Sequence, residues 1–183
     1  MDDKLKKILE EIKQQPIRSS VITAGALIDV MLEKVLRKLL LDTPKVDEMF
    51  KGSGSLCAFS AKISMAHALG LISKDLHDDI HLFRKIRNIC AHELSLDDKL
   101  MNDIRSQVGN FKLLKHTAIL GDNKDVQVHI GLEFSLIFFC LIKRLENVQK
   151  IEEYKFEIHD NYLTFSNEEN LYITDFTNKM KEK

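Results

Sequence analysis

One stretch of the sequence, residues 83–93, gathers side chains whose types and spacing could act on a phosphodiester. Arg87, Asn88 and His92 fall within six consecutive residues, and Asn88 and His92, four apart, share one face of a helix. A histidine that titrates near neutral pH can accept or give a proton, and an arginine can stabilise negative charge developing on a phosphate. The same three side chains could instead satisfy one another's hydrogen bonds at a packed interface.

The spacing of Arg87, a polar residue and His92 resembles the signature of HEPN domains, which are small helical bundles. Many HEPN domains are metal-independent ribonucleases. The resemblance implies that His92 transfers the proton and that Arg87 clamps the phosphate. One histidine per chain is few for both acid and base roles, so this reading needs a symmetric dimer in which two motifs face each other.

Two non-catalytic interpretations stay open beside the nuclease. In the first, Arg87 pairs with Asp29 or Glu33, and Asn88 and His92 bridge neighbouring helices in a buried network that specifies packing. In the second, Asp29, Arg87, Asn88 and His92 form a ligand or regulatory site. Solvent access discriminates between them, because a nuclease needs Arg87 and His92 open to a groove.

A second pair of histidines has the spacing of metal ligands. His77 and His81 lie four apart on a predicted helix, with Asp78 and Asp79 between them. The glutamate of an HExxH motif is missing, and His67 is a third ligand only if the fold brings it near. Solvated helix histidines are the favoured interpretation, so no metal and no cofactor are predicted.

Composition favours an all-α, multi-helix bundle. The chain has 183 residues, seven glycines and two prolines, and it is rich in leucine, isoleucine, lysine and glutamate. Three scattered cysteines without a CxxC pair are typical of a reducing, cytoplasmic location. The N-terminus lacks the apolar segment of a signal peptide, and the most apolar run, residues 134–142, is shorter than the ~20 residues that span a bilayer.

The spacing of apolar residues, together with capping residues, predicts where the helices begin and end. We expect helices over 3–15, 17–41, 44–50, 59–69, 74–92, from about 95 to 108, and 126–150. Thr43 and Ser73 are predicted caps, and Gly70 is a predicted left-handed terminator. Residues 154–164 alternate around an Asp-Asn turn and predict a small C-terminal β-hairpin, followed by a helix over 168–180. The domains are therefore residues 1–150 and a C-terminal extension, 151–183, packed on the same domain.

Three segments carry a wider resemblance. Residues 18–40 hold an acidic residue in the early helix, residues 49–72 hold Phe-Ser-x-Lys-Ile and then Leu-Gly-Leu-Ile, and residues 86–92 read Ile-Arg-Asn-x-x-Ala-His. In this order and spacing they resemble the mannitol operon repressor family. The family usually has an aromatic residue where Cys90 stands and an acidic residue where Ile89 stands.

The resemblance implies an all-helical transcriptional repressor of sugar-alcohol uptake genes. The residues themselves give little sign of direct DNA reading, because net charge is −1 and no helix-turn-helix or basic recognition helix stands out. The basic clusters at 34–38 and 143–144 are interpreted as solvated helix faces. The predicted protein is thus a homodimeric regulator that acts through a protein partner, with a HEPN-type ribonuclease, and hence RNA, as the alternative.

Overall fold

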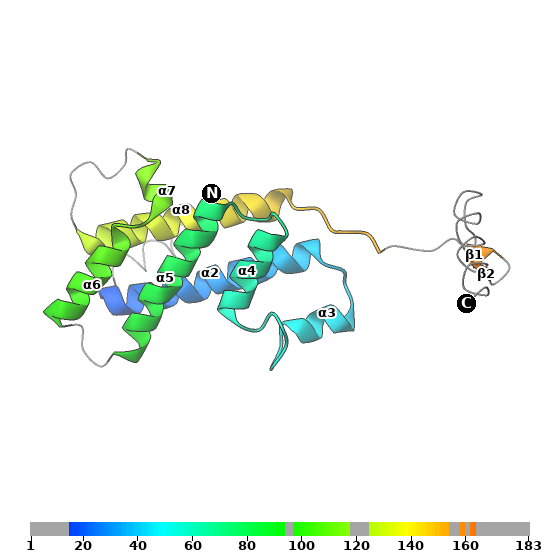
Figure 1. The fold of residues 1–183 in the computed structure, drawn as a ribbon, viewed down its shortest axis with the longest axis horizontal. Helices are drawn as coiled ribbons and strands as arrows, with labels where there is room; N and C mark the ends of the chain where they lie inside the picture. The colour runs from blue at the N-terminus through cyan, green and yellow to red at the C-terminus, as the bar shows by residue number, and fades with distance from the viewer. Residues whose placement is uncertain (1–14, 94–96, 118–124, 154–157, 160–161, 164–183) are drawn as a thin grey trace, which may run out of the picture. The chain divides into compact units, whose positions relative to one another are not determined.

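The helices observed in the computed structural model confirm the all-α bundle (Figure 1). The structure describes residues 15–93, 97–117, 125–153, 158–159 and 162–163. Its helices are α2 (Ile17–Leu39), α3 (Pro44–Met49), α4 (Phe59–Ala68), α5 (Lys74–His92), α6 (Asp98–Val108), α7 (Lys112–Lys115) and α8 (Val126–Asn147). The predicted helix over 168–180, and the helix over 3–15 except for its last residue, lie outside the described residues.

Short-range signals in the sequence set the helix ends. Thr43 caps α3 by accepting a hydrogen bond from the amide of Val46, and Ser73 caps α5 by accepting one from Leu76. Gly70 has φ +66°, the left-handed conformation predicted after α4. The sequence predicted no helix between residues 109 and 125, where the structure has the short helix α7.

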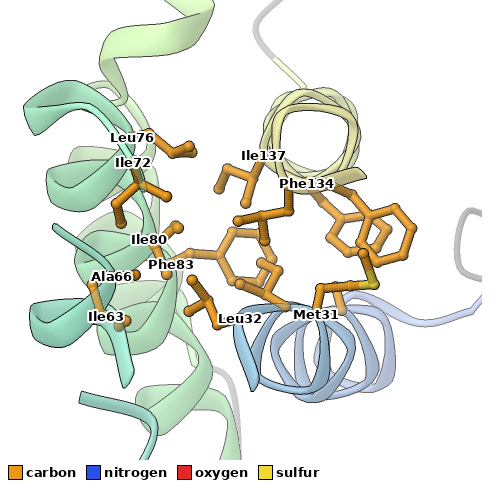
Figure 2. Packing of buried hydrophobic residues seen from close by; sticks show 14 of the residues in the cluster. Met31, Leu32, Ile63, Ala66, Ile72, Leu76, Ile80, Phe83, Phe134 and Ile137 are labelled. Atoms are coloured by element: carbon orange, nitrogen blue, oxygen red, sulfur yellow. The ribbon is translucent and has the colours of Figure 1, made fainter. Parts of the chain in front are cut away.

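The core lies where α2, α5 and α8 meet, with α4 closing one side (Figure 2). Each long helix contributes an inward stripe, and Phe83 of α5 and Phe134 of α8 pack with ring centroids 6.3 Å apart. Ile28 and Leu32 of α2 are fully buried against them. Burial of this apolar surface is the main stabilising contribution to the bundle.

Helix α8 is apolar enough to be considered as a membrane-spanning helix. By length and composition alone it is the one helix in the described parts of the chain that would be able to cross a membrane. It nevertheless buries Ile130, Phe134, Ile137 and Leu141 in the core. This inward stripe supports the prediction of a core helix, while the cytoplasmic location stays a prediction.

The chain divides into two compact units, Met1–Ile151 and Glu152–Lys183. In the second unit, β1 (Ile158–His159) pairs antiparallel with β2 (Tyr162–Leu163), within the segment where alternation predicted a hairpin. The remaining residues of that predicted hairpin lie outside the described residues. Packing of the extension on the helical domain stays a prediction.

Candidate functional site

Arg87 lies at the contact between α5 and α2. A Cβ built on Gly25 would be 2.9 Å from the Arg87 Cγ, so the arginine stem crosses α2 at the one position that has no side chain. At its tip, Nη1 donates to Oδ1 of Asn88 at 3.1 Å. Gly25 stands between Ala24 and Ala26, so this part of α2 has small side chains that let the arginine stem pass close to the helix.

The predicted set of Asp29, Arg87, Asn88 and His92 is only partly brought together. Arg87 and Asn88 are half-buried and bonded to each other, whereas His92, the last residue of α5, is exposed. The interpretation in which Arg87 pairs with Asp29 or Glu33 gains no support among the described residues, where Lys62 of α4 pairs with both carboxylates. The block therefore matches neither a fully buried network nor an open pair of catalytic groups.

Lys62 is the centre of the polar network that sequence reasoning missed. Its side chain is only 6% exposed, and its Nζ lies 3.0 Å from Asp29 Oδ1 and 2.8 Å from Glu33 Oε2. Burial opposes its charge, but the two carboxylates outweigh burial and raise the pKa of Lys62. A signal did exist: Lys62 shares the inward face of α4 with Ile63 and Ala66, and a buried lysine requires a carboxylate.

The same network continues along α2 to α3. Arg37 donates through Nε to Glu33 at 2.8 Å, pairs with Asp47, and lies 4.2 Å from the ring centroid of Phe50. Although burial opposes it, the bonds from Lys62 and Arg37 lower the pKa of Glu33. Arg37 is thus a half-buried bridge between helices, which corrects its interpretation as part of a solvated basic face.

The histidines considered as metal ligands pack on one another. The ring centroid of His77 lies 4.5 Å from that of His81 and 4.7 Å from that of His67, so the fold does bring His67 near. His77 Nδ1 lies 2.9 Å from Asp78 Oδ1. Burial, followed by the nearby His77 and Arg84, lowers the pKa of His81. In the described part of the chain, no group of three or more potential metal ligands converges.

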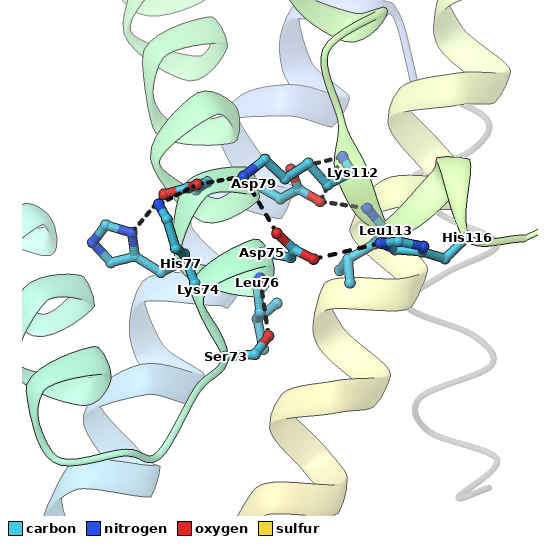
Figure 3. Close-up of polar contacts among 10 residues, drawn as sticks. Ser73, Lys74, Asp75, Leu76, His77, Asp79, Lys112, Leu113 and His116 are labelled. Carbon is cyan, nitrogen blue, oxygen red and sulfur yellow. Dashed lines mark hydrogen bonds and ion pairs between the residues drawn. The ribbon is translucent and has the colours of Figure 1, made fainter.

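A polar cluster ties α7 to α5 (Figure 3). Lys112 Nζ lies 2.6 Å from Asp78 and 3.3 Å from Asp75, and the hydrogen bond from Lys112, with those from His77 and Lys74, lowers the pKa of Asp78. The amides of Lys112 and Leu113 donate to the carboxylate of Asp79 at 2.7–3.0 Å. Asp79, which the sequence analysis named only as a residue between His77 and His81, is 1% exposed and holds the start of α7.

Behind Asp79 lies a second buried acid, Glu133 of α8, which is 0% exposed. Burial, followed by the charge of Asp79, raises the pKa of Glu133 to about 9, so Glu133 is a neutral acid at neutral pH. Glu133 was not among the predicted site residues, although its place between Ile130 and Ile137 on the inward stripe indicated burial.

Comparison with known proteins identifies the family. The family model described as MtlR, mannitol repressor, matches residues 4–130. Among solved structures, the chain is similar to "X-ray structure of the MtlR-HPr complex from Escherichia coli", with TM-score 0.59, 17% identity, and coverage of 74% of this chain and 96% of that chain. At this identity the likeness shows the fold alone, and no curated protein matched the chain. The HEPN alternative gains no support from these matches, and the chain belongs to the mannitol repressor family.

Proposed function

We propose that this chain regulates a sugar-alcohol uptake operon by binding another protein, and that it does not read DNA directly. The observation that carries the proposal is the mannitol repressor family match over residues 4–130. The similar solved structure is a complex of MtlR with HPr. An HPr protein is accordingly the partner that we propose for this chain, and a homodimer is the state in which the chain acts.

The distribution of basic side chains supports a protein partner over DNA. Arg37 is engaged by Glu33 and Asp47, Lys38 Nζ donates to the carbonyl of Leu145 at 2.6 Å, and Lys143 pairs with Glu146. Similarly, Lys112 is held by Asp75 and Asp78. DNA binding relies on basic side chains that are available to phosphates, and these four are occupied within the fold.

We assign the partner contact to the outer end of α5. His92 is exposed there, and Asn88 is half-buried one turn earlier. The guanidinium group of Arg87 is held beside Asn88 by a hydrogen bond to its side chain. Together these groups can donate and accept hydrogen bonds at the surface of a second protein. Because the aliphatic stem of Arg87 is fixed over Gly25, its guanidinium group is preorganised, which lowers the entropic cost of binding a partner.

Calorimetric titration with HPr from the same organism tests the proposal. We expect wild type to bind, and we expect His92→Ala and Asn88→Ala to weaken binding by about tenfold each, which corresponds to about 1.4 kcal/mol. His116→Ala is the matched control, because this exposed histidine directly follows α7, away from the end of α5, and it should bind like wild type.

If HPr does not bind, tests with operator DNA and with labelled RNA distinguish the two alternative functions, direct DNA binding and RNA cleavage. Operator DNA that shifts with the purified chain would overturn the proposal in favour of direct DNA reading. Labelled RNA that is cut by wild type and spared by His92→Ala would overturn it in favour of the nuclease. We expect neither the shift nor the cut.

A further inference from the structure

Arg84 of α5 is a half-buried cation that no carboxylate compensates among the described residues. Its side chain makes no ion pair and no hydrogen bond there, and its Nε is buried without an acceptor. Arg37, which is also half-buried, meets both Glu33 and Asp47. A buried donor without an acceptor is unfavourable, so the fold leaves at Arg84 a position that an anion would stabilise.

Arg87 and Asn88 present further donors on the same side of α5. With Arg84 they stand at positions i, i+3 and i+4 of one helix, a spacing that brings their Cβ atoms within about 5–6 Å of one another. Asn88 Oδ1 already accepts from Arg87 Nη1 at 3.1 Å, so the amide nitrogen of Asn88 remains a donor. Asp29, the acid first considered for Arg87, lies 3.0 Å from Lys62. Two guanidinium groups and one amide therefore gather without a carboxylate of their own in the described parts of the chain.

We propose that Arg84, Arg87 and Asn88 bind an oxyanion, either a free phosphate or the carboxylate of an acidic side chain on the bound protein. Guanidinium groups take the oxygens of either ligand through charge-assisted hydrogen bonds. Two arginines suit one anion, whereas DNA binding engages about 6–10 phosphates. The oxyanion site lies within the contact proposed for HPr, and it deepens the proposed function by naming the chemistry of that contact.

Arg84→Met separates anion binding from a structural role. Because Arg84 has no partner within the described part of the fold, the variant should unfold at a temperature no lower than that of wild type. Inorganic phosphate, compared with chloride at the same ionic strength, should raise the unfolding temperature of wild type more than that of Arg84→Met. Arg105→Met is the matched control, because this exposed arginine of α6 donates to Asn102, and it should respond to phosphate like wild type. A lower unfolding temperature of Arg84→Met without phosphate, or an equal rise in both proteins, overturns the proposal.

His81 reports where the anion binds. Burial, followed by the charges of His77 and Arg84, lowers the pKa of His81, and Asp78 opposes this shift. A phosphate bound at Arg84 offsets the charge of the arginine, so saturating phosphate should raise the pKa of His81 in wild type. NMR titration of the histidine ring protons measures this, and Arg84→Met should show no such rise. A phosphate that stabilises wild type but leaves the pKa of His81 unchanged binds elsewhere and overturns the assignment.

Titration with HPr distinguishes the two sources of the oxyanion. If a carboxylate of HPr occupies the site, Arg84→Met should weaken HPr binding by about tenfold or more, and phosphate should compete with HPr. If phosphate stabilises wild type but HPr binds both proteins alike, the ligand is the free anion. A wild type that phosphate does not stabilise, together with equal HPr binding by Arg84→Met, overturns the oxyanion site.

The oxyanion site and the proposed partner fail separately in these experiments. Phosphate that stabilises wild type through Arg84 in a chain that does not bind HPr would leave the site standing and overturn the partner. HPr binding that neither phosphate nor Arg84→Met changes, in a chain that phosphate does not stabilise, would do the reverse.

Discussion

Gly25 of α2 and Arg87 of α5 share one point of contact between their helices. A side chain at residue 25 would begin 2.9 Å from the Arg87 Cγ, so the arginine passes only because residue 25 is glycine. This crossing takes the guanidinium to Asn88, while Asp29, one turn further along α2, pairs with Lys62. The absence of a side chain at residue 25 thus lets the Arg87 stem cross α2 on its way to Asn88.

The first prediction follows from this contact. Gly25→Ala should gain up to ~1 kcal/mol from helix propensity. It should lose ~1–3 kcal/mol because the Arg87 stem must move, which leaves a net destabilisation of about 1 kcal/mol. In an Arg87→Ala background the clash is gone, so the same substitution should stabilise. Urea unfolding of the four proteins in a double-mutant cycle measures the difference.

A glycine without a close contact provides the control. Gly109 has φ −63°, and a Cβ there would be 3.6 Å from the nearest atom, the Ser106 carbonyl oxygen. Gly109→Ala should therefore stabilise by ~0.4–1 kcal/mol in either background. Equal effects of Gly25→Ala with and without Arg87 would show that the two residues are not coupled.

Lys62 provides the second prediction. Lys62→Met removes a buried cation and leaves Asp29 and Glu33 facing each other without it. Breaking a buried pair costs ~3–5 kcal/mol, and since the two carboxylates are about 30% exposed we expect about 2–3 kcal/mol at pH 7. Lys74→Met, at a 74%-exposed lysine, is the control and should cost less than ~1 kcal/mol.

The cost of Lys62→Met should also depend on pH. The pKa of Glu33 is lowered in the folded protein, so its stabilising contribution is present above its ordinary pKa of 4.5 and is lost as pH falls below it. The unfolding free energies of wild type and Lys62→Met should therefore converge between about pH 5 and pH 3. A gap that stays constant over this range would mean that Lys62 acts through packing and not through charge.

Local signals could be read from the sequence, and long-range pairings could not. Gly70 and Ser73 act on their own helix ends, so their roles followed from neighbouring residues alone. The partner of Asp29 depends on which helix lies beside α2, and the sequence offered Arg87 as plausibly as Lys62. The family resemblance named the segment that holds Lys62, but only packing of α4 on α2 turns that residue inward.

His92 provides the third prediction. The side chain is exposed at the last residue of α5, and no hydrogen bond or ion pair holds it within the described residues. His92→Ala should therefore change the unfolding free energy by no more than ~0.5 kcal/mol. Thermal and urea unfolding measure this, and a loss above 1 kcal/mol would show that His92 supports the fold and that reduced HPr binding by this variant is indirect.

The last prediction concerns Glu133, whose pKa is raised from 4.5 to about 9. The folded state keeps a proton that the unfolded state has released between these values, so wild type loses unfolding free energy as pH rises from about 5 to about 9. The slope is at most ~1.4 kcal/mol per pH unit for this one proton. Glu133→Gln has a similar shape and cannot titrate, so its stability should fall less steeply as pH rises, and the variant should exceed wild type most at pH 8–9.

Urea unfolding at intervals between pH 5.5 and 8.5 measures both slopes. Glu146→Gln is the matched control on the same helix, because its side chain is 55% exposed, and its curve should run parallel to that of wild type. If wild type and Glu133→Gln also run parallel, Glu133 is ionised in the folded protein at neutral pH. The burial of Glu133 and the neighbouring charge of Asp79 argue against that result, since neither stabilises an anion.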